Sequence, residues 1–205
     1  MIPTIAALVV FAATTANAQS LKVIQAKLDP KVASQAQFTK HVEKVGQEGD
    51  CGGFTYAASS TLAPAHHVHY DAKNLNDGLL GSAWCEGAPG SGVGESFTIT
   101  LDANDTHPAW KGRIEIMNGY ASNAKLFQKN GRIKTLKVSF NDKPIATVQL
   151  VDALGLQTFE LGDALPKDAQ TRGGVIKFEI AEVYGDGAKA EDTCVSEVRP
   201  AHCVP

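Results

Sequence analysis

Short segments in which apolar and polar residues alternate constrain this sequence more than any other feature. Phe97, Ile99 and Leu101 alternate with Ser and Thr, and Ile114 and Ile116 alternate with charged residues. Apolar residues at every second position place one face of an extended strand against a core. Short strands at regular spacing with turn signals between them predict an all-β sandwich or barrel. Similar segments follow at 135–140, 145–150, 159–161, 176–180 and 195–198.

The chain has 205 residues, of which 43% are hydrophobic, so we expect one domain with a sizeable core. Its formal net charge is −3 and it has no long basic run, which argues against nucleic acid or an anionic membrane as the main partner. An apolar run at 5–13 precedes an Ala-Asn-Ala site at 16–18, a pattern typical of a cleaved secretory signal. The run is too short to span a membrane. We expect a secreted or periplasmic mature protein that begins at Gln19.

Four cysteines in an exported chain indicate two disulfides, for which three connectivities are possible. We favour Cys85–Cys194, and Cys51–Cys203, which would join the two ends of the domain. A zinc site formed by all four is the alternative, but the sequence has no Cys-x-x-Cys pair to support it.

Residues 19–50 differ from the rest of the chain and form a leader. Apolar residues near helical spacing after Pro30 predict a helix at 31–45. The leader either packs on the domain or stays loose, and an arm that binds a partner is the second interpretation. The chain is thus divided into a signal peptide at 1–18, the leader at 19–50 and a β domain at 51–205.

A histidine cluster precedes the most polar stretch of the chain. His67 and His69 would share one side of an extended segment. No accompanying ligand set supports a metal site, so we predict a surface strand near a binding mouth.

The stretch at 74–87 is polar and broken by glycine, yet it carries a Trp and a Cys. Its Asp77 carboxylate, its carbonyls and the Ser82 hydroxyl suit a hard cation such as calcium, which takes oxygen ligands. The segment at 192–198 supplies a second Cys and a second carboxylate, Glu197. We expect the fold to bring these two segments together.

Two further loops are predicted to lie at one end of the sandwich. Tyr120 follows a predicted strand, and Asn130 and Arg132 precede the next one. An aromatic face beside an Arg and an amide is suited to gripping a sugar. A structural Tyr corner with a structural Arg is the alternative.

Over residues 56–198 the chain resembles a discoidin-type, galactose-binding-like jelly roll. The motifs include Asn74-Leu-Asn-Asp-Gly, Ala83-Trp-Cys-Glu-Gly, Ile116-Met-Asn-Gly-Tyr and Asp192-Thr-Cys-Val-Ser-Glu-Val. The series is similar to the glycan-binding domain first associated with the translocation region of bacterial NAD glycohydrolases. This resemblance implies a non-catalytic domain that binds carbohydrate or cell surfaces.

Carried over by position, the resemblance implies one structural calcium ion and no organic cofactor. A hydrogen-bond network in place of the ion is the alternative. One Arg stands where fucose-binding members carry two, which counts against fucose. The implied calcium ligands are carbonyls of Asn74, Leu79 and Ser196, the carboxylates of Asp77 and Glu197, and Ser82. The implied glycan-binding residues are Trp84, Glu86, Asn118, Tyr120, Asn130 and Arg132.

The leading prediction is therefore a secreted, non-catalytic carbohydrate-binding module with a glycan as its partner. The rival is a structural or protein-interaction jelly roll in which Trp84 and Tyr120 are core residues. An enzyme is disfavoured. Ser59 or Ser60 could form a catalytic triad with His66 and Asp77, but the sequence has no Gly-x-Ser-x-Gly motif to hold the nucleophile. Glycoside cleavage by paired carboxylates, Glu86 with Glu95 or Glu197, requires a defined distance between the two carboxyl groups, and the sequence does not give that distance. The oligomeric state stays open.

Overall fold

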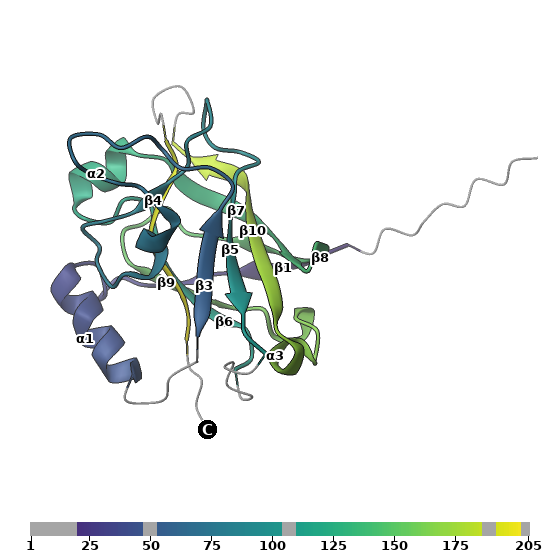
Figure 1. The fold of residues 1–205 in the computed structure, drawn as a ribbon. Helices are drawn as coiled ribbons and strands as arrows, with labels where there is room; N and C mark the ends of the chain where they lie inside the picture. Colours follow the sequence, from purple (N-terminus) through teal and green to yellow (C-terminus); the bar gives the residue numbers. More distant parts are fainter. Residues whose placement is uncertain (1–19, 47–52, 104–109, 186–191, 202–205) are drawn as a thin grey trace, which may run out of the picture.

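Strands from the whole length of the chain form two sheets that pack face to face (Figure 1). The structure, a computed structural model, describes residues 20–46, 53–103, 110–185 and 192–201. This arrangement confirms the predicted all-β jelly-roll sandwich. Within these residues the first sheet has six strands, in the order β1 (Lys22–Gln25), β8 (Lys143–Gln149), β7 (Arg132–Phe140), β10 (Gly174–Tyr184), β5 (Ser96–Leu101) and β3 (Phe54–Ala58). The second has five, in the order β2 (Lys27–Asp29), β9 (Leu156–Glu160), β6 (Arg113–Asn118), β11 (Cys194–Pro200) and β4 (Trp84–Cys85).

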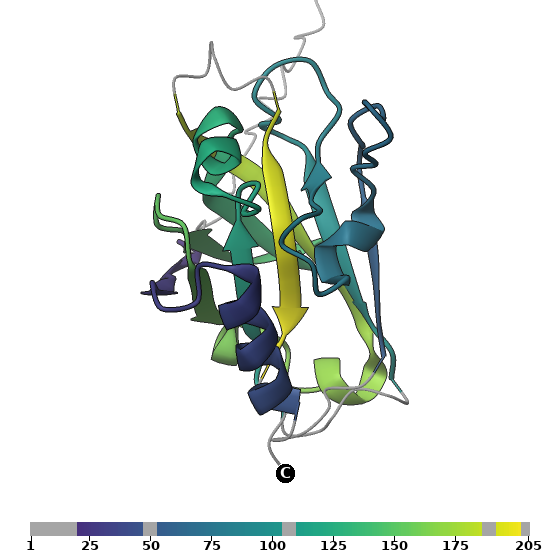
Figure 2. The same ribbon diagram turned by 90° about the vertical axis from the view of Figure 1, so that its left-hand side faces the viewer.

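Short helices lie outside the two sheets. Helix α1 (Gln35–Gly46) lies beside β11 on the outer face of the five-stranded sheet (Figure 2). Helix α2 (Ala124–Lys129) lies at the end of the sandwich that also carries the loops around β4 (Figure 1). The remaining turns of helix are α3 (Ala169–Arg172), η1 (Ala72–Asn76) and η2 (Gly162–Ala164). None of the described helices is long and apolar enough to cross a membrane.

The predicted alternating segments correspond to the strands β5 to β11. The hairpin between β7 and β8 turns at Asn141 and Asp142, whose φ angles are 46° and 64°. Positive φ at both central residues is the conformation of the tight hairpin turn that matches strand twist, and Asn and Asp tolerate it. The Asn-Asp turn therefore fixes the pairing of β7 with β8.

Aromatic rings from both sheets form the middle of the core. Phe97 and Phe178 of the six-stranded sheet stack with their centroids 5.0 Å apart. Trp84 and Phe159 of the five-stranded sheet meet this pair edge-on, at 5.6 Å from Phe97 and 6.2 Å from Phe178. Offset and edge-to-face contacts of this kind stabilise a core beyond the area they bury. The four rings thus join the two layers.

The leader is integrated into both sheets. Strand β1 pairs in parallel with β8, and β2 pairs antiparallel with β9. Helix α1 begins at Gln35, within the predicted range of 31–45, and its Phe38 is fully buried against Leu80 and Met117. The leader therefore packs on the domain, as the first of its two interpretations expected.

Two local predictions are wrong. The predicted surface strand at 64–70 is instead a tight turn, in which Ala65 and Val68 bridge each other and His66 and His67 have φ angles of 48° and 66°. The segment before Asn130, predicted as a loop, forms helix α2, which Asn123 caps by accepting a hydrogen bond from Leu126 N–H. The signal peptide and the Cys51–Cys203 pair fall outside the described residues.

Replacing Phe38 with Ala tests whether the leader is part of the fold. The change empties a buried site between α1 and the five-stranded sheet, so we expect a loss of about 3–5 kcal/mol in unfolding free energy. Urea denaturation followed by tryptophan fluorescence measures it. Lys40→Ala, on the exposed side of the same helix, should change stability by less than about 0.5 kcal/mol. Equal effects of both changes would show that the helix does not dock.

Candidate functional site

Strand β11 brings the two predicted segments together. Cys194 lies opposite Cys85 across β11 and β4, and the two form a disulfide with an S–S distance of 2.03 Å. This confirms the first predicted disulfide. The loop at 74–87 and the segment at 192–198 are therefore covalently joined at one end of the sandwich.

A polar cluster lies where β11 passes the loop after η1. The backbone N–H of Leu79 donates to Asp77 Oδ1 at 2.9 Å and to Glu197 Oε1 at 3.0 Å. The Ser82 hydroxyl donates to Asp77 Oδ2 at 2.6 Å. Glu197 is fully buried whereas Asp77 is exposed, so the cluster opens to solvent on the Asp77 side. Four of the six residues predicted to hold calcium therefore meet.

The electrostatics of this cluster are set by two neighbouring acids. Burial, followed by the charge and hydrogen bond of Asp77, raises the pKa of Glu197 to about 8, although N–H groups of Gly78 and Leu79 oppose the shift. No Lys or Arg within the described residues forms an ion pair with either acid. An oxygen-only set of this kind fits calcium chemistry. The described residues hold no group of three or more His, Cys, Asp or Glu for a metal, so an ion here would also depend on carbonyl and hydroxyl oxygens.

The other two predicted calcium ligands support the loop through their side chains. Asn74 Nδ2 donates to the carbonyls of His69 at 2.7 Å and Ala83 at 2.9 Å. The Ser196 hydroxyl accepts a hydrogen bond from Ala121 N–H at 2.9 Å. Any role of Asn74 and Ser196 toward an ion therefore belongs to their carbonyls, as the resemblance implied.

Both rings predicted to grip a sugar are buried. Trp84 is 0% exposed, and its indole N–H donates to the Ser60 carbonyl at 2.9 Å. Tyr120 is 9% exposed, and its hydroxyl donates to the Gly81 carbonyl at 3.1 Å. The predicted roles of these rings need correction: Trp84 completes the aromatic core and Tyr120 secures the loop at Gly81.

Glu86 and Asn118 are buried polar residues that serve the backbone. Glu86 accepts hydrogen bonds from Ala88 N–H at 2.8 Å and Thr193 N–H at 3.2 Å, and burial raises its pKa. Asn118 donates to the Ile133 carbonyl at 2.7 Å and accepts from its N–H at 2.9 Å, which links β6 to β7 across the two sheets. Neither side chain reaches the surface, so neither can take the glycan contact predicted for it.

Asn130 and Arg132 lie at the end of the sandwich, as predicted, but their side chains form hydrogen bonds within the protein there. Arg132 forms a bidentate pair with Asp152 at 2.9 and 3.0 Å and donates to the Asn130 carbonyl at 3.0 Å. Its guanidinium also lies over the Phe127 ring, 5.3 Å from the centroid. Asn130 Nδ2 donates to the Leu126 carbonyl at 2.9 Å. Such a planar bidentate pair is geometrically specific, and the Arg side chain is only 11% exposed.

The hypothetical catalytic triad is not assembled. Ser59 donates to Glu95 Oε2 at 2.6 Å, and Ser60 accepts from Gly87 N–H at 3.0 Å. His66 lies exposed in the tight turn, and Asp77 is bonded within the calcium-type cluster. The serines and the acid are thus committed to other partners.

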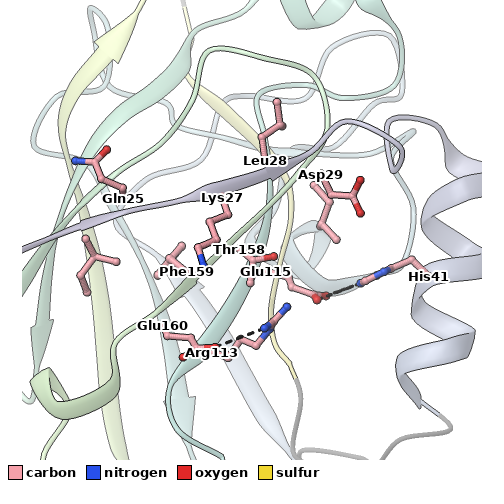
Figure 3. A pocket seen from close by; sticks show the side chains of 12 residues that line it. Gln25, Lys27, Leu28, Asp29, His41, Arg113, Glu115, Thr158, Phe159 and Glu160 are labelled. Carbon is pink, nitrogen blue, oxygen red and sulfur yellow. Dashed lines mark hydrogen bonds and ion pairs between the residues drawn. The ribbon is translucent and has the colours of Figure 1, made fainter.

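Sequence reasoning missed a cleft on the outer face of the five-stranded sheet, which we call the leader cleft. It has a volume of about 400 Å³ and lies among β2, α1, β6 and β9 (Figure 3). Leu28, Leu156 and Phe159 form the apolar part of its lining. Its charged lining residues are Lys27, Asp29, His41, Arg113, Glu115 and Glu160.

A buried acid lies at the base of the leader cleft. Glu115 is 1% exposed, and both of its carboxylate oxygens lie 3.1 Å from His41 Nε2. Arg199 Nε lies 3.3 Å from Glu115 Oε2. Burial opposes ionisation of Glu115, but the hydrogen bond and charge of His41 and the charges of Arg199 and Arg113 outweigh it and lower its pKa. Alternation had placed Glu115 on a solvent face, because α1 was not predicted to cover that face.

The profile of one protein family matches most of the chain. The family described as "NAD glycohydrolase translocation F5/8 type C domain" matches residues 50–200. The chain belongs to this family. The matched range contains the disulfide, the Asp77–Glu197 cluster and one wall of the leader cleft, whereas the leader of this F5/8 type C protein precedes it. Among curated proteins none matches the chain.

Solved structures with the same fold are CBM32 domains. The CBM32-1 and CBM32-2 domains of Clostridium perfringens ZmpB align with a TM-score of 0.56 and 11% identity, covering 93% of this chain and 43% of that one. A second structure, with the CBM32-1, CBM32-2 and M60 catalytic domains of ZmpB, aligns with a TM-score of 0.52 and 13% identity, covering 92% of this chain and 17% of that one. At this identity the likeness concerns the fold, and the F5/8 type C chain spans less than half of either protein.

Glu197→Gln tests the electrostatics of the F5/8 type C domain. Between about pH 4.5 and pH 8 the folded state holds a proton that the unfolded chain releases, so stability should fall as pH rises across this range. Gln cannot titrate, and the variant should lose this part of the pH dependence. Thermal unfolding at several pH values without calcium measures the difference.

The control for this experiment is Glu179→Gln on the outer face of β10, which should keep the slope of the wild type. Millimolar calcium should then raise the melting temperature of the wild type at pH 8 and leave Glu197→Gln unchanged. Identical pH slopes in the wild type and Glu197→Gln would contradict the raised pKa. Equal effects of calcium on both would contradict the ion site.

Proposed function

We propose that this protein is a secreted, non-catalytic carbohydrate-binding module. The observation that carries the proposal is a jelly roll of the F5/8 type C family with the fold of CBM32 domains. That fold presents loops from both sheets at one end, where a ligand can be held without a deep pocket. The family resemblance, which implies binding to carbohydrate or cell surfaces, points in the same direction.

The disulfide supports the secreted part of the proposal. Cys85–Cys194 joins β4 to β11 and closes a loop of 109 residues. Stable disulfides of this kind belong to oxidising compartments, which agrees with a signal peptide at 1–18. We place the mature protein outside the cytoplasm on these grounds.

Calcium is a proposed component of the loop end. Asp77, Glu197, Ser82 and the Leu79 carbonyl would hold it, and the ion would neutralise the two acids and fix the loop after η1. Its effect would be structural, since Glu197 lies beneath the loop and away from solvent. Residues on the outer surface of the loops would then contact the glycan.

The burial of Trp84 and Tyr120 favours a second candidate function. Both rings are core or anchor residues, as expected for a structural or protein-interaction jelly roll. Exposed apolar side chains on the loops, Val68, Leu79 and Val93, would suit contact with another protein. This candidate predicts binding without any sugar.

A glycan array tests the proposal against this alternative. The mature protein, residues 19–205, is displayed as a multivalent complex, since module sites often bind at about millimolar to micromolar affinity. We expect selective binding to a set of glycans, which weakens in EDTA if calcium holds the loop. A sample with its disulfide reduced and alkylated controls for binding by unfolded chains. A blank array from the folded, disulfide-bonded protein would overturn the proposal and favour the protein-interaction function.

A further inference from the structure

The leader cleft is built from two parts of the chain that are distant in sequence. Lys27 and Asp29 of β2 and His41 of α1 form one wall, and side chains of β6 and β9 form the other (Figure 3). The family match begins at residue 50, so the first wall lies outside the matched range. The cleft therefore exists because the leader of this chain docks on the five-stranded sheet.

The polar groups at the base of the cleft divide into satisfied and unsatisfied ones. Glu115 is satisfied by His41 and Arg199, which makes it a structural support for α1. Arg113 Nε and Arg199 Nε are both buried without a hydrogen-bond partner among the described residues, although Arg199 Nε lies within ion-pair distance of Glu115 and Arg113 Nη1 lies 3.5 Å from Glu160. A buried donor of this kind costs free energy until an acceptor reaches it. The cleft thus presents a partly exposed guanidinium, that of Arg113, beside an acid that is already paired.

Other polar groups surround Arg113. Lys27 lies opposite Thr158 in the β2–β9 pairing, and its ammonium forms no ion pair with any described residue. Figure 3 shows Lys27 and Arg113 extending toward the same space from opposite sides. Glu160 and Asp29 add acceptors at the rim. Donors and acceptors therefore face one another across the cleft.

The charges of the lining indicate a neutral ligand. Lys27 and Arg113 are cations, whereas Asp29, Glu115 and Glu160 are carboxylates, so an ion of either sign would meet a like charge. A ligand with several hydroxyl groups can accept from the cations and donate to the carboxylates. Leu28, the partly exposed apolar residue of the lining, would contact the C–H face of such a ligand. A cavity of about 400 Å³ falls within the usual size of small-molecule sites.

We propose that the leader cleft binds a neutral mono- or disaccharide unit, in a site separate from the loop end. The exposed part of the Arg113 guanidinium and Lys27 Nζ donate to its oxygens, and Glu160 and Asp29 accept from its hydroxyls. The inference rests on the proposed carbohydrate-binding function and places a sugar site on the side of the sandwich. A glycan chain held at the loop end could then also be contacted by the leader.

Two variants alter the cleft while keeping Glu115, His41 and Arg199 in place in the sequence, although Thr158 lies directly opposite Glu115 in the β6–β9 pairing. Thr158→Trp fills it from β9, and Lys27→Ala removes a donor. Their matched controls are Thr147→Trp, on the outer face of β8, and Lys22→Ala, on β1 of the same leader. Thermal unfolding first establishes that all four variants fold.

The probes are D-glucose, D-galactose, D-mannose, L-fucose, N-acetyl-D-glucosamine and N-acetyl-D-galactosamine, with D-glucuronate as the charged counterpart of glucose. Backbone amide NMR spectra of the full mature chain report where each sugar binds. We expect at least one neutral sugar to shift the amides of His41, Arg113 and Thr158. Both cleft variants should weaken this binding about tenfold or more, and the controls should leave it unchanged.

Several results would overturn the cleft site. One is that sugars shift only the amide signals of loop-end residues such as Gly81 and Arg132, or that no sugar of the panel shifts the amides of the cleft. The others are undiminished binding in Thr158→Trp and tighter binding of glucuronate than of glucose. The array separates this failure from that of the proposed function. Wild-type and cleft variants that bind the array equally would overturn the cleft site alone, whereas a blank array for the wild type would overturn the proposed function.

Discussion

The register of β11 against its two neighbours fixes the polar features of the molecule. Against β4 it sets Cys194 opposite Cys85, and against β6 it sets Arg199 opposite Glu115. Glu197, between them, is carried beneath the loop that contains Asp77 and Leu79. A slip of one residue would turn each of these side chains to the other face of the sheet. One strand therefore supplies one cysteine of the crosslink, the buried acid of the Asp77–Glu197 cluster and the cation beside Glu115.

Alternation and turn chemistry were sufficient to predict the architecture. The strands from β5 to β11 follow from apolar residues at every second position, and the Asn141–Asp142 turn follows from residue types that tolerate positive φ. The pairing of Cys85 with Cys194 was also anticipated. The turn at His66 and His67 was not, because the segment was interpreted as extended and has no Gly, Asn or Asp to signal a turn.

The candidate site was less predictable, because the type of a polar residue does not reveal which group in the fold is its hydrogen-bond partner. Arg132 and Asn118 have the chemistry of ligand-binding residues, yet Asp152 and the Ile133 backbone use their hydrogen-bonding capacity. Buried polar groups are almost always paired, so position in the fold decides whether such a residue is available. The leader cleft escaped notice for a related reason. Its two walls are far apart in sequence, and His41 gave no sign that Glu115 would be its partner.

The leader also has a consequence for the order in which the chain can fold. Gln25 at the end of β1 bonds to Gln149, 124 residues later, and β2 pairs with β9. Although the leader is synthesised early, neither contact can form until most of the domain has emerged. Non-local pairings of this kind slow folding, and until they form β8 and β9 remain open sheet edges. The docking of β1 and β2 therefore depends on β8 and β9, which follow them in the chain by more than 100 residues.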